Sequence, residues 1–175
     1  MRSRYKVVEA GAYFVTSSII EWIEIFQDEE YCEIIIDELK FRRRRNEMKL
    51  FGYIIMPNHM HLIISSEKLS DVVRSIKSYT ARKIIDQLKD RKSELLLKKF
   101  EICKQEFKIQ SKYQIWQEGF HPKLIMNDKE FEQKIEYIHN NPVKNGLINS
   151  PDEWKYSSYK NYSGGSALIE IDNFI

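Results

Sequence analysis

Two histidines stand one residue apart in the stretch IIMPNHMHLIISS, residues 54–66, which is otherwise mostly apolar. Residues two apart on a β-strand project from the same face, so His59 and His61 point together and can share one divalent metal ion. Two imidazole ligands leave coordination positions open for water, a substrate oxygen and a third protein group. The motif is short, and a pair of half-exposed strand histidines without a ligand is the alternative interpretation.

A second candidate group lies in DKEFEQKIEYIHNN, residues 128–141. Tyr137 and Asn141 are four residues apart, which places them on one face of a helix. A phenol with a pKa of about 10 is a poor nucleophile at neutral pH, but a nearby cation that polarises a phosphodiester makes the electrophile more reactive. Metal-assisted phosphoryl transfer is therefore chemically sensible. Alternatively, Tyr137 packs an amphipathic helix and Asn141 only ends it before Pro142.

The elements that must position these residues follow from hydrophobic periodicity and turn signals. The expected strands cover residues 13–20, 50–56, 59–65 and part of 113–125, with a tight turn at Pro57-Asn58. The expected helices begin at Asp28, at Ser70 or Asp71, and at Asn127 or Asp128, and Pro142 is expected to end the last. The order β-α-β-β-α-β-α indicates an α+β, ferredoxin-like antiparallel sheet with helices packed on one face.

Length and composition predict one domain over residues 1–175. The chain is 42% hydrophobic and 31% charged, which is typical of a folded protein rather than a disordered one. It contains no run of about 18 apolar residues, and its first residues lack the apolar core of a secretory signal, so we expect a cytoplasmic protein with no membrane partner. Residues of about 90–112 form a basic segment, either a continuing helix or an insertion, and an irregular tail is expected from about 146.

Positive charge is concentrated in two parts of the sequence. Residues 42–45 are four consecutive arginines, and residues 74–112 hold twelve Lys or Arg against five acids. A basic face suits a phosphate polymer, although solvated faces of long helices give the same pattern. The residues predicted to contact DNA on this basis are Arg42, Arg43, Arg44, Lys98, Lys99 and Lys104.

Four motifs, taken in this order and at these separations, resemble one known family. They are MPNHMHLII, IWQEGFHPKLI, YIHNNPVKNGLI and EWKYSSY, and together they resemble the REP-associated tyrosine transposases, a branch of the HUH single-strand DNA transposases. The resemblance implies that His59 and His61 bind a divalent ion, Mg or Mn, and that Tyr137 is the nucleophile. It assigns Asn141 to complete the metal site, where better known minimal transposases of the superfamily have glutamine. The basic segment of residues 90–111 does not match the family confidently.

The resemblance implies an enzyme, a metal-dependent single-stranded DNA endonuclease and strand transferase acting through a 5′-phosphotyrosine intermediate. Its expected partner is single-stranded or hairpin DNA, and its expected state is a monomer or a homodimer. Two alternatives stay open: a domesticated, non-catalytic DNA-binding protein, and a metal-dependent hydrolase of a small phosphoester. The other histidines, His121 and His139, are expected to be surface or DNA-facing residues rather than ligands.

Overall fold

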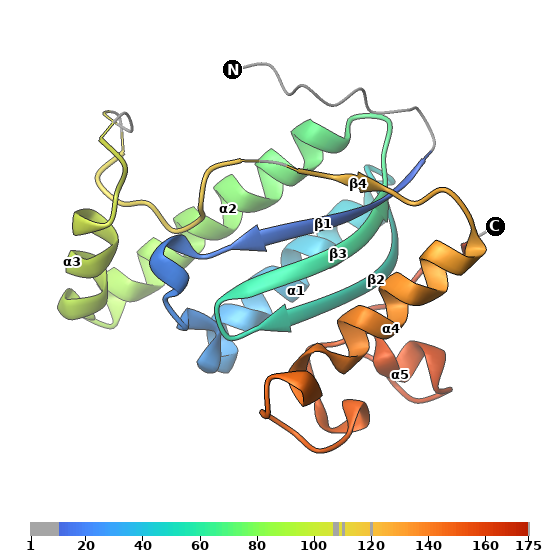
Figure 1. Cartoon of the computed structure of the whole chain (residues 1–175). Helices are drawn as coiled ribbons and strands as arrows, with labels where there is room; N and C mark the ends of the chain where they lie inside the picture. The colour runs from blue at the N-terminus through green and yellow to red at the C-terminus, as the bar shows by residue number, and fades with distance from the viewer. Residues whose placement is uncertain (1–10, 107–108, 110, 120, 175) are drawn as a thin grey trace.

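The computed structural model describes residues 11–106, 109, 111–119 and 121–174. Within these residues, four antiparallel strands form one sheet in the order β2-β3-β1-β4 (Figure 1). Their bounds are β1 Ala12–Ser18, β2 Lys49–Met56, β3 His59–Ser65 and β4 Lys123–Leu124. The hairpin predicted at Pro57-Asn58 is confirmed, whereas β4 is much shorter than the strand-like stretch of residues 113–125 suggested.

In the described part of the chain, five α-helices and three short 3-10 helices accompany the sheet. The α-helices are α1 Glu29–Arg44, α2 Leu69–Asp90, α3 Glu94–Ile102, α4 Asp128–Lys144 and α5 Tyr159–Tyr162. The 3-10 helices are η1 Ile20–Trp22, η2 Ile25–Gln27 and η3 Pro151–Glu153. Asp28 and Asn127 cap α1 and α4 through their side chains, as predicted. Neither Ser70 nor Asp71 caps α2, because this helix begins at Leu69 and its N-terminal capping position is Lys68.

Helices cover both faces of the sheet, and the α+β antiparallel fold is confirmed. On one face, α1 and α2 bury a large apolar cluster that includes Tyr53 and Leu62. Helix α4 lies on the other face (Figure 1). There its Ile135 and Ile138 belong to a smaller apolar cluster. The expectation that all helices pack on one face is therefore wrong. Helices pack on both faces because the interior residues of β2 and β3 are mostly apolar or aromatic on both sides of the sheet. Both sides therefore have to be buried.

Gly52 allows α4 to approach the sheet closely. A Cβ atom at this position would lie 2.7 Å from Cδ1 of Ile135 and 3.1 Å from Cδ1 of Ile138. A register shift between Leu50 and Gly52 interrupts the β2–β3 pairing at the same place. The glycine thus fixes how near the helix that carries Tyr137 can come to β2.

The prediction that Pro142 ends α4 is wrong, since the helix continues to Lys144. Pro142 has no N–H to donate, but the last turn is held by other backbone bonds. Asn145 N donates to Asn141 O at 3.1 Å, and Leu147 N donates to Pro142 O at 2.9 Å. The extra turn brings Asn145 toward the same side of the helix as Asn141.

The basic segment of residues 90–112 contains a separate helix, α3, rather than an extension of α2. A turn at residues 91–93 divides the two helices, with Lys92 in the left-handed region at φ 53°. Phe100 of α3 is fully buried in the cluster beneath α1 and α2. Apolar burial therefore anchors α3, while Lys98 and Lys99 face solvent.

The tail from about residue 146 contains little regular secondary structure. It runs along the edge of β2 that does not pair with β3. Tyr156 O accepts from Ile55 N at 2.9 Å, and Ser158 N donates to Tyr53 O at 2.9 Å. Further along, Asp172 N donates to Leu50 O at 2.7 Å. The tail therefore covers an edge strand that would otherwise expose unpaired backbone groups. In the described part of the chain, no helix combines the length and apolarity needed to cross a membrane.

Candidate active site

The two strand histidines lie together on the face of the sheet that α4 covers. Their ring centroids are 4.8 Å apart, and β3, which carries both, is an interior strand paired on each side. Phe14 of β1 stacks on the His61 ring at 5.1 Å, and His61 is only 4% exposed. A strand held on both edges fixes the relative position of the two imidazoles more firmly than a loop would.

Hydrogen bonds to the Nδ1 atoms set the orientation of both rings. His59 Nδ1 lies 2.7 Å from Asn58 Oδ1, an oxygen that can only accept, so this nitrogen carries the proton. His61 Nδ1 lies 2.8 Å from Thr16 Oγ1, and Nδ1 can donate there too. His61 Nε2 is buried and has no hydrogen-bond partner among the described residues. A buried nitrogen without a partner, in a ring oriented through Nδ1, has the chemistry and the orientation that a metal ligand needs.

Burial keeps both imidazoles neutral. It lowers the pKa of His59, and it lowers the pKa of His61 to about 3, with smaller contributions from the charges of His59 and Lys134. A neutral imidazole retains the lone pair that binds a metal. The described residues include no third His, Cys, Asp or Glu that completes a cluster, so a further protein ligand would have to be an amide such as Asn141.

Helix α4 places Tyr137 directly over the histidine that is more deeply buried. The ring of Tyr137 lies 5.5 Å from that of His61 and 5.8 Å from that of Phe14, both edge-on. Tyr137 is 42% exposed, so the phenol is accessible from outside. Asn141 is buried one turn further along, and its Oδ1 accepts from Asn145 Nδ2 at 2.8 Å, which leaves a second lone pair. The structure therefore brings together the four residues predicted from sequence.

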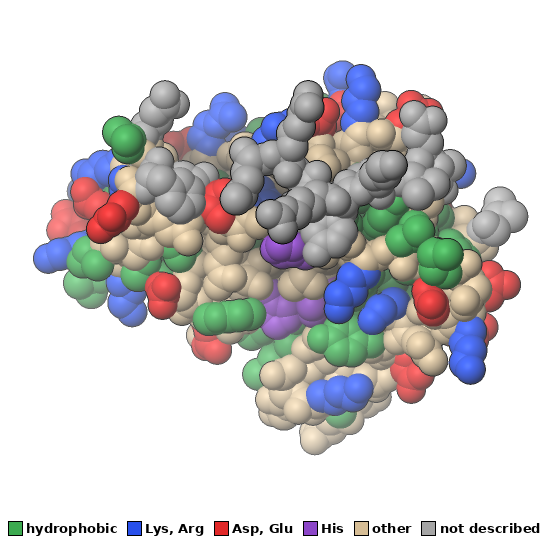
Figure 2. Space-filling view, turned by 45° about the horizontal axis from the view of Figure 1, so that its top comes forward, with side chains coloured by type: hydrophobic (Ala, Val, Ile, Leu, Met, Phe, Trp, Pro, Cys, Tyr) green, Lys and Arg blue, Asp and Glu red, His purple; other side chains and the backbone are tan. Residues whose placement is uncertain are grey.

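These residues line one cavity of about 540 Å³. Its lining comprises Phe14, Thr16, Trp22, His59, His61, Lys123, Lys134, Tyr137, Asn141 and Asn145. None of these is acidic, and the Nζ atoms of Lys134 and Lys144 lie 5.8 and 5.9 Å from the centre of the Tyr137 ring. Figure 2 shows histidine side chains at the surface of this face with Lys or Arg side chains beside them. The cavity suits an anion.

The basic residues predicted to contact DNA do not line this cavity. Arg42 is paired with Glu38 and Glu47, and Arg43 with Asp172. Arg44, Lys98 and Lys99 are exposed, and Lys104 is partly buried. Their contact with DNA stays a prediction.

Sequence reasoning missed the cationic and aromatic walls of the cavity. Lys134 precedes Tyr137 by three residues, so helical spacing alone could have placed it on the same face. Lys144 does not line the cavity but lies beside the Tyr137 ring, and it was missed because the helix was expected to end before it. Trp22 had no such signal, since it lies in a turn whose conformation is set by distant backbone contacts.

His139 is a core residue, which contradicts its prediction as a surface or DNA-facing side chain. It is buried, and its Nε2 lies 2.9 Å from Ser158 Oγ, which also accepts from Tyr53 N at 3.0 Å. Burial lowers its pKa to about 4. The error arose because the tail, which could not be placed from sequence, supplies the partner. His139 thereby ties α4 to β2 and to the tail.

Comparison with known proteins points to transposases. The family described as "Transposase IS200 like" matches residues 19–141. A Haemophilus influenzae protein described as a REP-associated tyrosine transposase is 34% identical over 108 residues, which cover 60% of this chain and 55% of that protein. The REP-associated tyrosine transposase of Escherichia coli is 22% identical over 152 residues, 87% of this chain and 78% of that protein.

A solved structure of a REP-associated tyrosine transposase bound to a REP hairpin has the same fold. It superposes with a TM-score of 0.64 at 19% identity and covers 99% of this chain and 94% of that one. The chain spans only about half the length of the Haemophilus relative. The family match, in contrast, covers well over half of this chain and includes both histidines, Tyr137 and Asn141. The chain therefore belongs to the IS200-like transposase family.

Proposed function

We propose that this protein is a metal-dependent endonuclease and strand transferase of single-stranded DNA, with Tyr137 as its nucleophile. The observation that carries the proposal is the placement of the Tyr137 ring 5.5 Å from a buried histidine whose Nε2 lacks a partner among the described residues. Membership of a transposase family supports the same reaction class.

The metal would be held by His59 and His61, with the amide oxygen of Asn141 as the third protein ligand or as the partner of a bound water. When bound, a divalent ion withdraws electron density from the scissile phosphodiester and makes phosphorus more electrophilic. Imidazole nitrogens suit transition metals better than they suit Mg²⁺, which prefers oxygen ligands. We therefore expect Mn²⁺ to support the reaction at lower concentrations than Mg²⁺.

The protein's own groups account for the covalent step. The Tyr137 hydroxyl gives up its proton, and its oxygen forms a bond to phosphorus as the bond from phosphorus to the 3′ oxygen breaks. The 3′ oxygen takes up a proton and leaves as a hydroxyl, so the protons balance. The 5′ phosphate stays on Tyr137, and Lys134 lies where it can offset the charge of the phosphate. A 3′ hydroxyl from another strand can attack this phosphotyrosine and restore a phosphodiester, so no nucleotide cofactor is required.

The DNA partner is proposed to be single-stranded and to include a hairpin. Among the described residues, those that line the cavity include lysines and no carboxylate, which suits the phosphate backbone. A neighbour with the same fold was solved with a REP hairpin bound.

The test is incubation with a labelled hairpin bearing single-stranded flanks, in Mn²⁺ or Mg²⁺ and in EDTA. The proposal predicts a denaturant-resistant protein–DNA adduct that requires metal and carries a label placed 3′ of the nick, never one placed 5′ of it. DNA binding without cleavage would instead indicate a non-catalytic binding protein. Cleavage without an adduct, or hydrolysis of small phosphoesters alone, would indicate a hydrolase.

A further inference from the structure

The turn between β1 and α1 holds two successive non-glycine residues in the left-handed region. Glu21 has φ 49° and Trp22 has φ 54°. This conformation is unfavourable for residues with a Cβ, so the surroundings must impose it. They do so through backbone bonds at the preceding residues, since Ile19 N donates to Asn58 O and Ile20 N to Ile115 O, both at 2.8 Å.

The result of this strained turn is an exposed indole. Ile19 and Ile20 are buried, whereas Trp22 is 56% exposed. A turn that buries its isoleucines and turns its largest apolar side chain outward is not explained by core packing. Residues in sparsely populated backbone conformations are concentrated at functional sites, and this one lies beside the histidine pair.

Trp22 forms one wall of the candidate active site. Its ring lies 6.1 Å from that of His59 and nearly perpendicular to it, at 79°. It lines the same cavity as Tyr137, Lys123 and Lys134. The cavity therefore offers an apolar aromatic surface next to cationic groups, with no carboxylate among its lining residues.

We propose that Trp22 is a stacking subsite for an unpaired base of single-stranded DNA, at a nucleotide adjoining the phosphate that Tyr137 attacks. The inference rests on the proposed function because it takes single-stranded DNA as the substrate. An indole recognises the π-face of any base, while the lysines recognise the backbone that carries it. An apolar peptide would use the indole but leave the lysines without counter-charges, so the mixed lining favours a nucleic acid.

Oligonucleotide affinity measured in the absence of a divalent metal tests stacking independently of cleavage. The probe is a fluorescent oligothymidylate of about twelve nucleotides, compared with an abasic oligomer that has the same number of phosphates. Trp22→Ala should weaken binding of the oligothymidylate between about 5-fold and about 150-fold and leave the abasic oligomer unaffected. Tyr79→Ala, which removes an exposed aromatic outside the cavity, is the matched control and should change neither affinity.

Two further measurements distinguish stacking from a structural role. Oligothymidylate should quench the tryptophan emission of the wild type and not that of Trp22→Phe. Of the other two tryptophans, Trp116 is buried, and Trp154 packs against the smaller apolar cluster and does not line the cavity. Trp22→Gly removes both the indole and the Cβ that makes φ 54° unfavourable, so it should weaken binding without lowering Tm. A lower Tm together with weaker binding of both oligomers would assign the indole to folding and overturn the proposal.

The outcomes also separate this inference from the proposed function. If the wild type and Trp22→Ala bind oligothymidylate equally well, the stacking subsite is wrong and the nuclease proposal stands. If the wild type binds no single-stranded DNA at all, the proposed function fails and the stacking subsite fails with it.

Discussion

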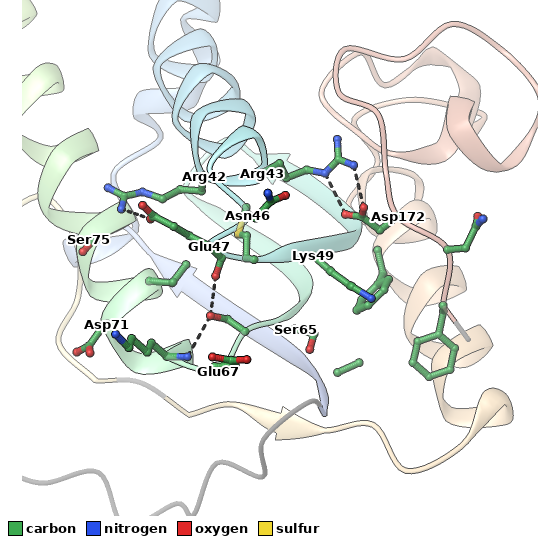
Figure 3. A pocket seen from close by; sticks show the side chains of 18 residues that line it. Arg42, Arg43, Asn46, Glu47, Lys49, Ser65, Glu67, Asp71, Ser75 and Asp172 are labelled. Carbon is green, nitrogen blue, oxygen red and sulfur yellow. Dashed lines mark hydrogen bonds and ion pairs between the residues drawn. The ribbon is translucent and has the colours of Figure 1, made fainter.

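Two cavities in this protein are both lined by basic residues, yet they differ in what neutralises the charge. The larger, of about 870 Å³, lies where the end of α1 and the start of α2 meet β2 and the tail (Figure 3). It has four basic and four acidic lining residues, and dashed lines in Figure 3 mark the pairing of Arg42 with Glu47 and of Arg43 with Asp172. The smaller cavity, at the histidine pair, contains lysines and no acid among its lining residues.

The comparison teaches that neither size nor a run of arginines identifies the anion site. The arginines of the larger cavity are paired with carboxylates, which offset their charge locally. Lys134 has aromatic rings as its neighbours instead, with its Nζ 5.0 Å from the centre of the Phe14 ring. The number of positive charges in a segment therefore matters less than whether acids lie opposite them.

The largest effect should come from removing a metal ligand in the smaller cavity. His61→Ala should lower metal-dependent cleavage by more than about 100-fold, because even the partners of ligands typically contribute about 10- to 100-fold. Titration of Mn²⁺ followed by calorimetry, together with cleavage of the labelled hairpin, measures both losses. DNA binding in EDTA should persist, since lysines supply it. Normal cleavage by this variant would place the metal elsewhere.

A smaller effect is expected when a single cavity lysine is neutralised. Lys134→Met should reduce cleavage roughly 10-fold and flatten the dependence of log affinity on log salt by about 0.7, the contribution of one single-strand phosphate contact. Lys83→Met is a matched control, because its Nζ also lies 5.8 Å from a tyrosine ring, that of Tyr79 on α2. Equal salt slopes for both variants and the wild type would remove Lys134 from the DNA interface.

A substitution in the larger cavity should lower the stability of the fold and leave DNA affinity unchanged. Asp172 accepts two hydrogen bonds from Arg43, each 3.0 Å, and one of 2.8 Å from Leu50 N. Asp172→Asn should therefore lower the free energy of unfolding by about 1–2 kcal/mol, measured by urea denaturation, with DNA affinity unchanged. If Asp172→Asn is folded and still binds DNA more weakly than the wild type, the two cavities are coupled.

The pH dependence of this loss follows from the pKa of Asp172. Burial alone would raise that pKa, but the bonds from Arg43 and Leu50 N outweigh it and hold the pKa below its usual value. A carboxylate with a lowered folded-state pKa stabilises the fold above its unfolded pKa, and this contribution disappears as pH falls through the folded pKa. The difference between wild type and Asp172→Asn should therefore be full near neutral pH and shrink below about pH 4.

Local chemistry allowed much of the site to be predicted from the sequence. The same-face placement of His59 and His61 needs only the period of a strand, and the shared face of Tyr137 and Asn141 needs only that of a helix. Asp28 and Asn127 were found as caps because they bond to backbone groups two or three residues away. Each of these features is decided within a few residues of sequence.

What could not be predicted depends on contacts between distant segments. The burial of His139 depends on Ser158, which reaches it only because the tail runs along β2. The orientation of Trp22 depends on backbone partners at Asn58 and Ile115. The face on which α4 packs follows from the double-sided apolar character of β2 and β3, which a single helix pattern does not reveal.

The identity of the nucleophile is the central claim, and Tyr137→Phe tests it most directly. Phenylalanine keeps the ring contacts with His61 and Phe14 and removes only the oxygen. Tyr79→Phe is the matched control, because Tyr79 is 37% exposed, close to the 42% of Tyr137, and lies on α2 away from the cavity. With labelled hairpin DNA and Mn²⁺, we predict that Tyr79→Phe forms the denaturant-resistant adduct at the wild-type level and that Tyr137→Phe binds the DNA and forms none. An adduct formed by folded Tyr137→Phe would contradict the account and require another nucleophile.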